Sequence, residues 1–202
     1  MQSATHKCIF IHIPKCAGTT IRNTLQPLIN GHAAHSHCVA SSYDKPELKN
    51  YFMFSFVRNP WDRFLSAFLY LKAGGACTHF NGADWDDDII KVLGIDKAAT
   101  FSEFLRDKKF LKENLFRGQH FVPLCGYLDR DIDFVGKVEN LQEDFNLVCN
   151  KIGISAPKLP CINKTKTQSS RKHYTSYYSA ENAEFVAELY AQDIDKFTYK
   201  FK

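Results

Sequence analysis

The chain has 202 residues, of which 45% are hydrophobic and 24% charged, a composition typical of a soluble globular protein. This length allows one domain with a substantial core, and we expect a single domain over residues 1–202. The formal net charge of +4 is too small to indicate, by itself, a nucleic-acid-binding protein, and it fits a local anionic ligand better.

The N-terminal segment and the cysteines bear on the cell compartment. The apolar run near the N-terminus is short and contains His12 and Pro14, so it predicts neither a secretion signal nor a membrane span. The seven cysteines are scattered and include no CxxC pair, which is typical of reduced thiols. We therefore expect a cytoplasmic protein without a membrane span.

The first structural unit is a strand, a turn and a helix. Residues 8–13 (CIFIHI) form a continuous run of apolar and β-branched residues, which predicts a buried strand. Residues 14–20 form a turn, and Thr19 or Thr20 can cap a helix over residues 21–29.

The second unit repeats this order. Residues 51–58 (YFMFSFVR) predict a buried strand, which ends at Asn59-Pro60 because proline cannot continue a ladder. Apolar residues then recur at helical spacing over residues 61–72. Strands that alternate with helices predict an α/β fold, in which a parallel β-sheet is flanked by helices.

The rest of the chain continues this pattern less regularly. Residues 73–99 resemble a surface excursion, and residues 155–178 are polar and irregular. The remaining predicted elements are a helix over 101–111 opened by a Thr100–Glu103 capping box, a strand over 132–138, a helix over 139–154 with Leu147 facing inward, and a helix over 180–192 capped by Ser179.

The turn after the first strand has the features of an anion site. A helix N-terminus offers unpaired N–H groups and a positive dipole end, and Gly18 allows a close approach. Lys15 adds a positive charge, and Thr19 and Thr20 add hydroxyl donors. The lysine precedes the glycine, so the GxxxxGK[ST] pattern of nucleotide-binding loops is absent. An ordinary strand–helix turn with a surface lysine is the alternative.

The turn after the second strand predicts a second anion contact. Arg58 ends the strand, where α/β proteins bind ligands, and Ser66 lies about two turns into the next helix. An arginine fork with a hydroxyl suits a phosphate group. In the alternative interpretation Arg58 pairs with Asp62, while Asp62 and Arg63 belong to a solvated face. For Arg63 we expect this solvated position.

Together, PKCAGTT (14–20) and FVRNPWDRFLSAF (56–68) resemble the PAPS-dependent sulfotransferases, in particular the carbohydrate type related to heparan sulfate 2-O-sulfotransferase. PAPS is 3′-phosphoadenosine 5′-phosphosulfate. The segments FRGQHFVP (116–123), DFVGKVENLQEDF (133–145) and NKTKTQSSRKHYTSYYSAEN (163–182) resemble later blocks of the family in the same order. The resemblance implies a P-loop nucleotide-kinase-like sulfotransferase fold, PAPS as co-substrate, adenosine 3′,5′-bisphosphate as product and no metal. It also implies a Golgi-lumenal location if this sequence belongs to a longer chain.

The resemblance also assigns roles to residues. The 5′-phosphosulfate would be held by Lys15, Ala17, Gly18, Thr19 and Thr20. Arg58 and Ser66 would hold the 3′-phosphate. A basic stretch would fold over the nucleotide, unless it is merely a solvated loop; its residues are Lys164, Lys166, Ser169, Ser170, Arg171 and Lys172.

Sulfuryl transfer to an alcohol needs a base, and histidine is the natural one near neutral pH. Residues 32–37 offer His32, His35 and His37, and the resemblance favours His37 as base, with His35 as a substrate-binding or supporting group. An exposed structural loop or a metal site is the alternative. The other candidates are Gln119 and His120 as acceptor contacts, each with a structural role as the alternative, and His12 as a hydrogen-bonded core histidine.

The sequence therefore predicts an enzyme that transfers a sulfuryl group from PAPS to a hydroxyl of a carbohydrate or glycoconjugate, with His37 as general base and Lys15 stabilising the leaving group. The alternatives are a small-molecule alcohol as acceptor, a nucleotide-dependent phosphotransferase, and a silent module that binds the nucleotide without catalysis. A phosphotransferase would need a Mg-binding serine or threonine directly after a P-loop lysine, and a Walker-type acid, and neither is found in the right arrangement.

Overall fold

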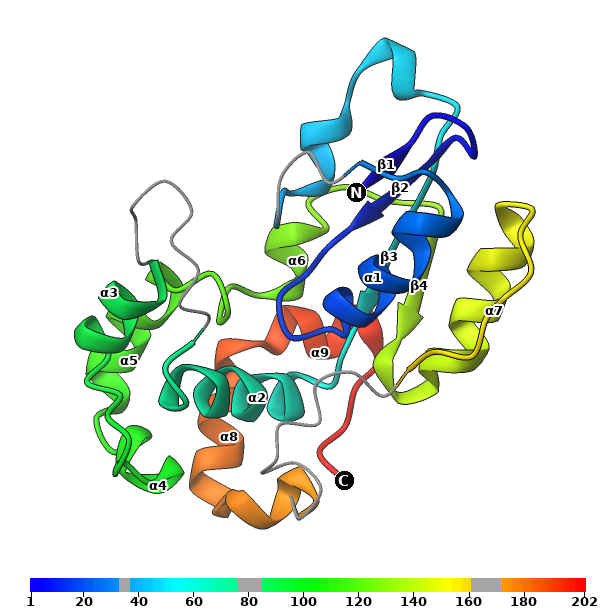
Figure 1. Ribbon diagram of the computed structural model, residues 1–202. Helices are drawn as coiled ribbons and strands as arrows, with labels where there is room; N and C mark the ends of the chain where they lie inside the picture. Colours follow the sequence, from blue (N-terminus) through cyan, green and yellow to red (C-terminus); the bar gives the residue numbers. More distant parts are fainter. Residues whose placement is uncertain (33–36, 76–84, 161–171) are drawn as a thin grey trace. The chain divides into compact units, whose positions relative to one another are not determined.

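The computed structural model describes residues 1–32, 37–75, 85–160 and 172–202 (Figure 1). The chain folds into two compact units, each described here by itself. The first comprises Met1–Arg58 and Leu124–Arg171, and the second comprises Asn59–Pro123 and Lys172–Lys202. That residues 1–202 act as a single domain stays a prediction.

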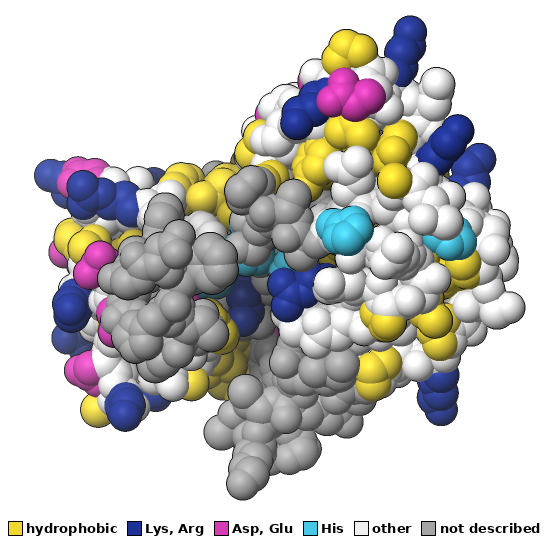
Figure 2. All heavy atoms as spheres, turned by 45° about the horizontal axis from the view of Figure 1, so that its top comes forward, with side chains coloured by type: hydrophobic (Ala, Val, Ile, Leu, Met, Phe, Trp, Pro, Cys, Tyr) yellow, Lys and Arg dark blue, Asp and Glu magenta, His cyan; other side chains and the backbone are white. Residues whose placement is uncertain are grey.

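One face of the surface is drawn in Figure 2. On it, Lys and Arg side chains of the described residues lie singly or in small groups, and some of them lie beside acidic ones. This dispersal fits the small net charge of +4. In the described ranges, no helix has the length and apolar character needed to cross a membrane.

The first unit contains a four-stranded sheet in the order β1-β2-β3-β4. Strands β2 (Cys8–Ile11), β3 (Phe52–Val57) and β4 (Phe134–Lys137) are parallel, with Phe10 opposite Phe54 and Phe54 opposite Phe134. Strand β1 (Gln2–Ser3) pairs antiparallel with β2. The α/β class is confirmed, but the sheet is mixed rather than wholly parallel. Strand β1 was not predicted because two residues are too few to show a periodic pattern.

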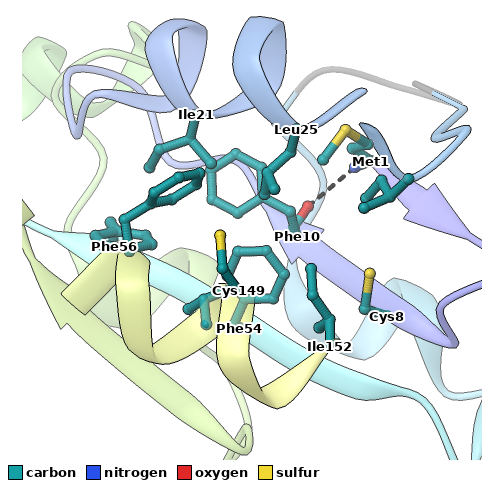
Figure 3. Close-up of a cluster of buried hydrophobic side chains, with 12 residues drawn as sticks. Met1, Cys8, Phe10, Ile21, Leu25, Phe54, Phe56, Cys149 and Ile152 are labelled. Atoms are coloured by element: carbon teal, nitrogen blue, oxygen red, sulfur yellow. Dashed lines mark hydrogen bonds between the residues drawn. The ribbon is translucent and has the colours of Figure 1, made fainter. Parts of the chain in front are cut away.

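Two helices pack on one face of this sheet. Helix α1 (Gly18–Leu28) contributes Ile21 and Leu25, and helix α7 (Leu141–Lys151) contributes Phe145 and Val148 to a single buried cluster (Figure 3). The sheet side of this cluster includes Cys8, Phe10, Phe54 and Phe56. Alternate strand residues reach this face because successive side chains of a strand point to opposite sides. This sheet and these helices fix where the strand ends lie.

Several boundaries in the first unit differ from the prediction. The strand predicted over 8–13 ends at Ile11, and α1 begins at Gly18 with Ala17 as its N-cap, so neither predicted threonine cap is right. The helix predicted over 139–154 is shorter and is preceded by the 3₁₀ turn η4 (Val138–Asn140). Leu147 is 55% exposed, not inward, because it lies about 200° around the helix from Phe145. The described part of the unit also contains the short helical segments η1 (Ala40–Tyr43), η2 (Pro46–Leu48) and α6 (Leu124–Tyr127).

The second unit is helical in its described part and has an aromatic core. Helix α2 (Pro60–Lys72) begins after Asn59, whose side chain accepts a hydrogen bond from the Trp61 N–H. Around α2 the buried rings of Phe64, Phe68, Phe101, Phe104 and Phe121 contact one another. Trp61 also donates from Nε1 to the carbonyl of Ala183, 2.8 Å away.

Four predictions are corrected in this unit. Residues 73–99 are not only a surface excursion, because they include helix α3 (Trp85–Val92) with Ile89 buried. The helix over 101–111 is two helices, α4 (Phe101–Phe104) and α5 (Lys108–Asn114), because Asp107 caps a new one. The helix over 180–192 is also two, α8 (Ala180–Leu189) and α9 (Ala191–Phe197). Arg63 is 2% exposed and lies inside the unit, not on a solvated face.

The predicted caps of this unit are confirmed. The Thr100–Glu103 capping box forms, and Ser179 accepts a hydrogen bond from the Asn182 N–H. The unit's remaining described elements are η3 (Leu115–Arg117) and η5 (Tyr174–Tyr177).

Candidate active site

The turn between β2 and α1 has an unusual backbone conformation. Lys15 and Ala17 both adopt left-handed backbone, with φ of 67° and 58°. The side chain of Ala17, the N-cap, makes no capping hydrogen bond, and Gly18 begins the helix. Strained turns of this type aim successive N–H groups at an anion, and the helix dipole favours negative charge there. The turn is therefore suited to a phosphate or sulfate group.

Arg58 lies beside this turn. It follows β3, which pairs in parallel with β2, so the residues after both strands emerge at the same edge of the sheet. Its Nη1 donates to the carbonyl oxygen of Lys15 over 3.2 Å. The guanidinium thus braces the turn and places a second positive charge next to Lys15, since an arginine has five N–H donors and can contact an anion at the same time.

His37 also lies at this edge of the first unit. Its Nδ1 is 3.0 Å from the carbonyl oxygen of His12, and its φ is 67°. A carbonyl can only accept, so Nδ1 must carry the hydrogen, and the neutral ring then has its lone pair on Nε2. A histidine held in this tautomer is ready to take a proton through Nε2.

The segment after His37 is hydrogen-bonded to Asp129, which is distant in the sequence. The Ser41 N–H donates to Asp129 Oδ1 over 2.9 Å, and the Ser41 hydroxyl donates to Asp129 Oδ2 over 2.5 Å. Burial acts to raise the pKa of the Asp129 carboxyl, but these hydrogen bonds outweigh it, and the pKa lies below its usual value. The carboxylate therefore stays charged and anchors the segment that carries His37.

His12 is a site neighbour that the sequence interpretation missed. It follows β2 rather than lying within it, so the prediction that places it inside a strand is wrong. Its ring centroid is 4.5 Å from that of His37. Burial, followed by the nearby charges of His37 and Arg22, lowers the pKa of His12 from 6.5 to about 3. No pattern in the adjacent sequence indicates this position, because it depends on contact with residue 37.

The other residues of the first turn occupy the start of α1. Gly18 and Thr20 are buried, and Thr19 is half-buried. The structure thus brings together the predicted donor turn, Arg58 and His37 within one unit.

The remaining described candidates belong to the second unit. Ser66 is buried on α2, Gln119 is half-buried and Lys172 is exposed. His120 is 6% exposed, with Nε2 2.8 Å from Asp86 Oδ1, and Asp86 Oδ2 accepts from the Tyr70 hydroxyl over 2.8 Å. This burial and pairing fit the structural alternative for His120. His35, Lys164, Lys166, Ser169, Ser170 and Arg171 lie outside the described residues.

Metal ligation has no candidate in the part of the chain that the structure describes. Within those ranges, no group of three or more His, Cys, Asp or Glu side chains could hold a metal ion. The metal alternative for residues 32–37 includes His35, which is outside them.

Comparison with known proteins agrees with the geometry of this edge. A model of the sulfotransferase family matches residues 1–200. The chain belongs to the sulfotransferase family. The turn, Arg58 and His37 all lie within the matched range, so the resemblance seen in the two motifs is confirmed at the level of the family.

Individual sulfotransferases and one further protein are distantly similar. Carbohydrate sulfotransferase 11 of Rattus norvegicus and that of Mus musculus are each 25% identical over 229 residues. The alignment covers 96% of this chain but only 65% of the length of these relatives. An uncharacterized protein of Archaeoglobus fulgidus is 30% identical over 122 residues, which cover 60% of this chain and 84% of that protein. No solved structure gives a significant match.

Proposed function

We propose that this protein transfers the sulfuryl group of PAPS to a hydroxyl of a carbohydrate or glycoconjugate acceptor. One observation carries the proposal: an anion-holding turn with Lys15, braced by Arg58, lies in the same unit as a histidine whose Nε2 can accept a proton. Family membership supports PAPS as the donor and a P-loop-like fold.

The charges of the turn suit the donor. PAPS carries phosphate and sulfate groups, and Lys15 and the N–H groups of the turn are the contacts that its 5′-phosphosulfate would need. Arg58 is the predicted contact of the 3′-phosphate. The roles of Ser66, Ser170, Arg171 and Lys172 rest on the family resemblance and stay predictions.

The chemistry is a direct displacement at sulfur. The acceptor oxygen forms the new S–O bond while its proton passes to His37 Nε2, and the bond from sulfur to the 5′-phosphate oxygen breaks. The electron pair of that bond stays on the phosphate oxygen, where Lys15 and the N–H groups of the turn stabilise the developing charge. The products are the sulfate ester and adenosine 3′,5′-bisphosphate, and His37 returns its proton to solvent.

The choice of a carbohydrate acceptor has separate support. It comes from the names of the two rodent relatives, which are 25% identical, and from the resemblance of the motifs to the carbohydrate type. A small-molecule alcohol is the alternative acceptor, because one fold accommodates many acceptors.

A transfer assay tests the proposal. We would incubate the protein with ³⁵S-labelled PAPS and, in parallel, desulfated glycosaminoglycans, short oligosaccharides and small alcohols and phenols, with Mg-ATP as the competing donor. We expect label on a saccharide, loss of transfer in Lys15→Ala, and unchanged transfer in the control Lys49→Ala, whose lysine is exposed. Turnover with Mg-ATP and none with PAPS would overturn the donor assignment, and label only on small alcohols would overturn the acceptor assignment.

A further inference from the structure

The imidazole of His12 is enclosed on three sides within the first unit. Its ring lies 4.5 Å from the ring of His37 and 5.8 Å from that of Phe10, almost parallel to the latter at 15°. The third side faces Gly18, the first residue of α1. One ring therefore contacts both the donor turn and the predicted base.

Gly18 is needed because of this ring. A Cβ atom at Gly18 would lie 1.8 Å from His12 Cδ2 and 2.1 Å from His12 Nε2, far inside van der Waals contact. The backbone of Gly18 is helical and not left-handed, so its conformation alone would accept an L-residue. A glycine in such a turn is usually explained by the close approach of a ligand. Here the packing of the His12 ring against Gly18 is a second reason for the glycine.

We propose that His12 is a positioning residue that sets the spacing between the donor turn and His37. This inference rests on the proposed function, since it assigns a role to the distance between donor site and base. Because the ring is packed against Phe10 as well, it cannot move away from a new Cβ at Gly18 without disturbing its neighbours. A change at Gly18 is therefore transmitted to His37.

The electrostatics of His12 fit a spacer and not a second base. Its pKa of about 3 keeps the ring neutral near pH 7. The groups that bear on it are His37, Arg22 of α1 and the amino group of Met1. A neutral ring can pack against His37 without opposing the positive charge that His37 gains when it takes the acceptor's proton.

Paired substitutions test this inference. Gly18→Ala should push the His12 ring and lower kcat by about 10- to 100-fold, the effect expected of a misplacement near 1 Å. His12→Ala should also lower kcat, but the double variant H12A/G18A should be no worse than H12A, because the space for the methyl group now exists. H12F/G18A should stay as impaired as G18A, because phenylalanine keeps the ring.

A matched control separates this coupling from general damage. His6 is also half-buried, and its Nδ1 lies 3.0 Å from the Ile152 carbonyl, but it does not contact Gly18. The effects of H6A and G18A should therefore add on a logarithmic scale. If H12A and G18A also add, the proposed coupling is wrong.

A second measurement does not depend on turnover. The ¹⁵N chemical shifts of the His37 ring depend on the geometry of the hydrogen bond from its Nδ1 to the His12 carbonyl, and therefore on the position of the ring. They should change in G18A and H12A but not in H12F. Unchanged His37 shifts in G18A and H12A would overturn the inference. If the wild type neither binds adenosine 3′,5′-bisphosphate nor transfers sulfate, the proposed function fails, whereas these spectra still decide the role of His12. If G18A does not fold, the comparison of H12A with H12F decides it.

Discussion

His37 Nδ1 lies 3.0 Å from the backbone carbonyl oxygen of His12, and this contact fixes which nitrogen of His37 can act as a base. The acceptor is a backbone atom, so no side-chain substitution at His12 removes it. The chain therefore separates two tasks: the carbonyl of residue 12 sets the tautomer of His37, and the ring of residue 12 supports its position.

The first prediction concerns His37 itself. His37→Asn should lower kcat by about 10²- to 10⁴-fold, the range typical of a lost general base, while the Kd for adenosine 3′,5′-bisphosphate changes little. Asparagine is the informative substitution because it tolerates the left-handed backbone of residue 37, where φ is 67°. Initial rates and calorimetric titration check both quantities. His32→Asn, at an exposed histidine, is the control, and wild-type kcat in His37→Asn would exclude His37 as base.

The second prediction concerns Arg58. Its Nη1 donates to the Lys15 carbonyl, so Arg58→Ala removes both a brace of the turn and a positive charge. We expect the Kd for adenosine 3′,5′-bisphosphate to rise by about 10- to 100-fold, as for the loss of a hydrogen bond to a charged group. Arg58→Lys should recover only part of the affinity, because lysine lacks the planar fork.

The control for Arg58 is Arg106→Ala. The Arg106 side chain is 79% exposed and lies in the second unit. The Arg106→Ala variant should bind adenosine 3′,5′-bisphosphate with the same Kd as the wild type. Equal affinities for Arg58→Ala and the wild type, measured by titration at one fixed salt concentration, would contradict the assignment of Arg58.

The third prediction is the pH dependence of stability. Burial first, then neighbouring charges, lowers the pKa of His12 from 6.5 to about 3, so between these pH values the unfolded chain binds more protons than the folded one. The free energy of unfolding should therefore fall as pH drops below 6.5, by about 2 kcal/mol at pH 5 from this residue. Above pH 6.5 the contribution of His12 to the pH dependence vanishes.

His12→Phe should remove this part of the pH dependence, because phenylalanine takes up no proton. Urea unfolding at pH 5 and pH 8 measures it, with His32→Asn as a control that retains the wild-type difference. A His12→Phe variant with the same difference between the two pH values as the wild type would show that His12 is not the group responsible.

The residues expected to bind the donor, Lys15 and Arg58, could be predicted from the sequence, and the reason is physical. Lys15 and Arg58 each follow a strand that reads as a buried apolar run, and neighbouring parallel strands end at the same edge of a sheet. Their proximity thus follows from two local patterns and one topological rule. The Thr100 and Ser179 caps were predictable for a similar reason, because capping depends on a few adjacent residues.

What escaped prediction depends on contacts between distant segments. Nothing local to Arg63 indicates that it is buried, and nothing near His12 indicates that a ring from residue 37 and the start of α1 will enclose it. The break between α4 and α5 was missed because the Asp107 cap competes with a continuous helical pattern. Tertiary packing decides such cases, and propensity does not.

The last prediction concerns Asp129, which is 88 residues from its partner Ser41 and was not among the predicted site residues. Its carboxylate accepts two hydrogen bonds from Ser41, four residues after His37, so Asp129→Ala should loosen the segment that carries the base. We expect kcat to fall by about 3- to 10-fold, as for a modest misplacement, while the Kd for adenosine 3′,5′-bisphosphate stays unchanged because the donor turn is untouched. Asp131→Ala, at an exposed acid two residues away, should keep wild-type kcat. A weaker nucleotide affinity with an unchanged kcat in Asp129→Ala would contradict this role, because it would connect Asp129 to the donor turn and not to His37.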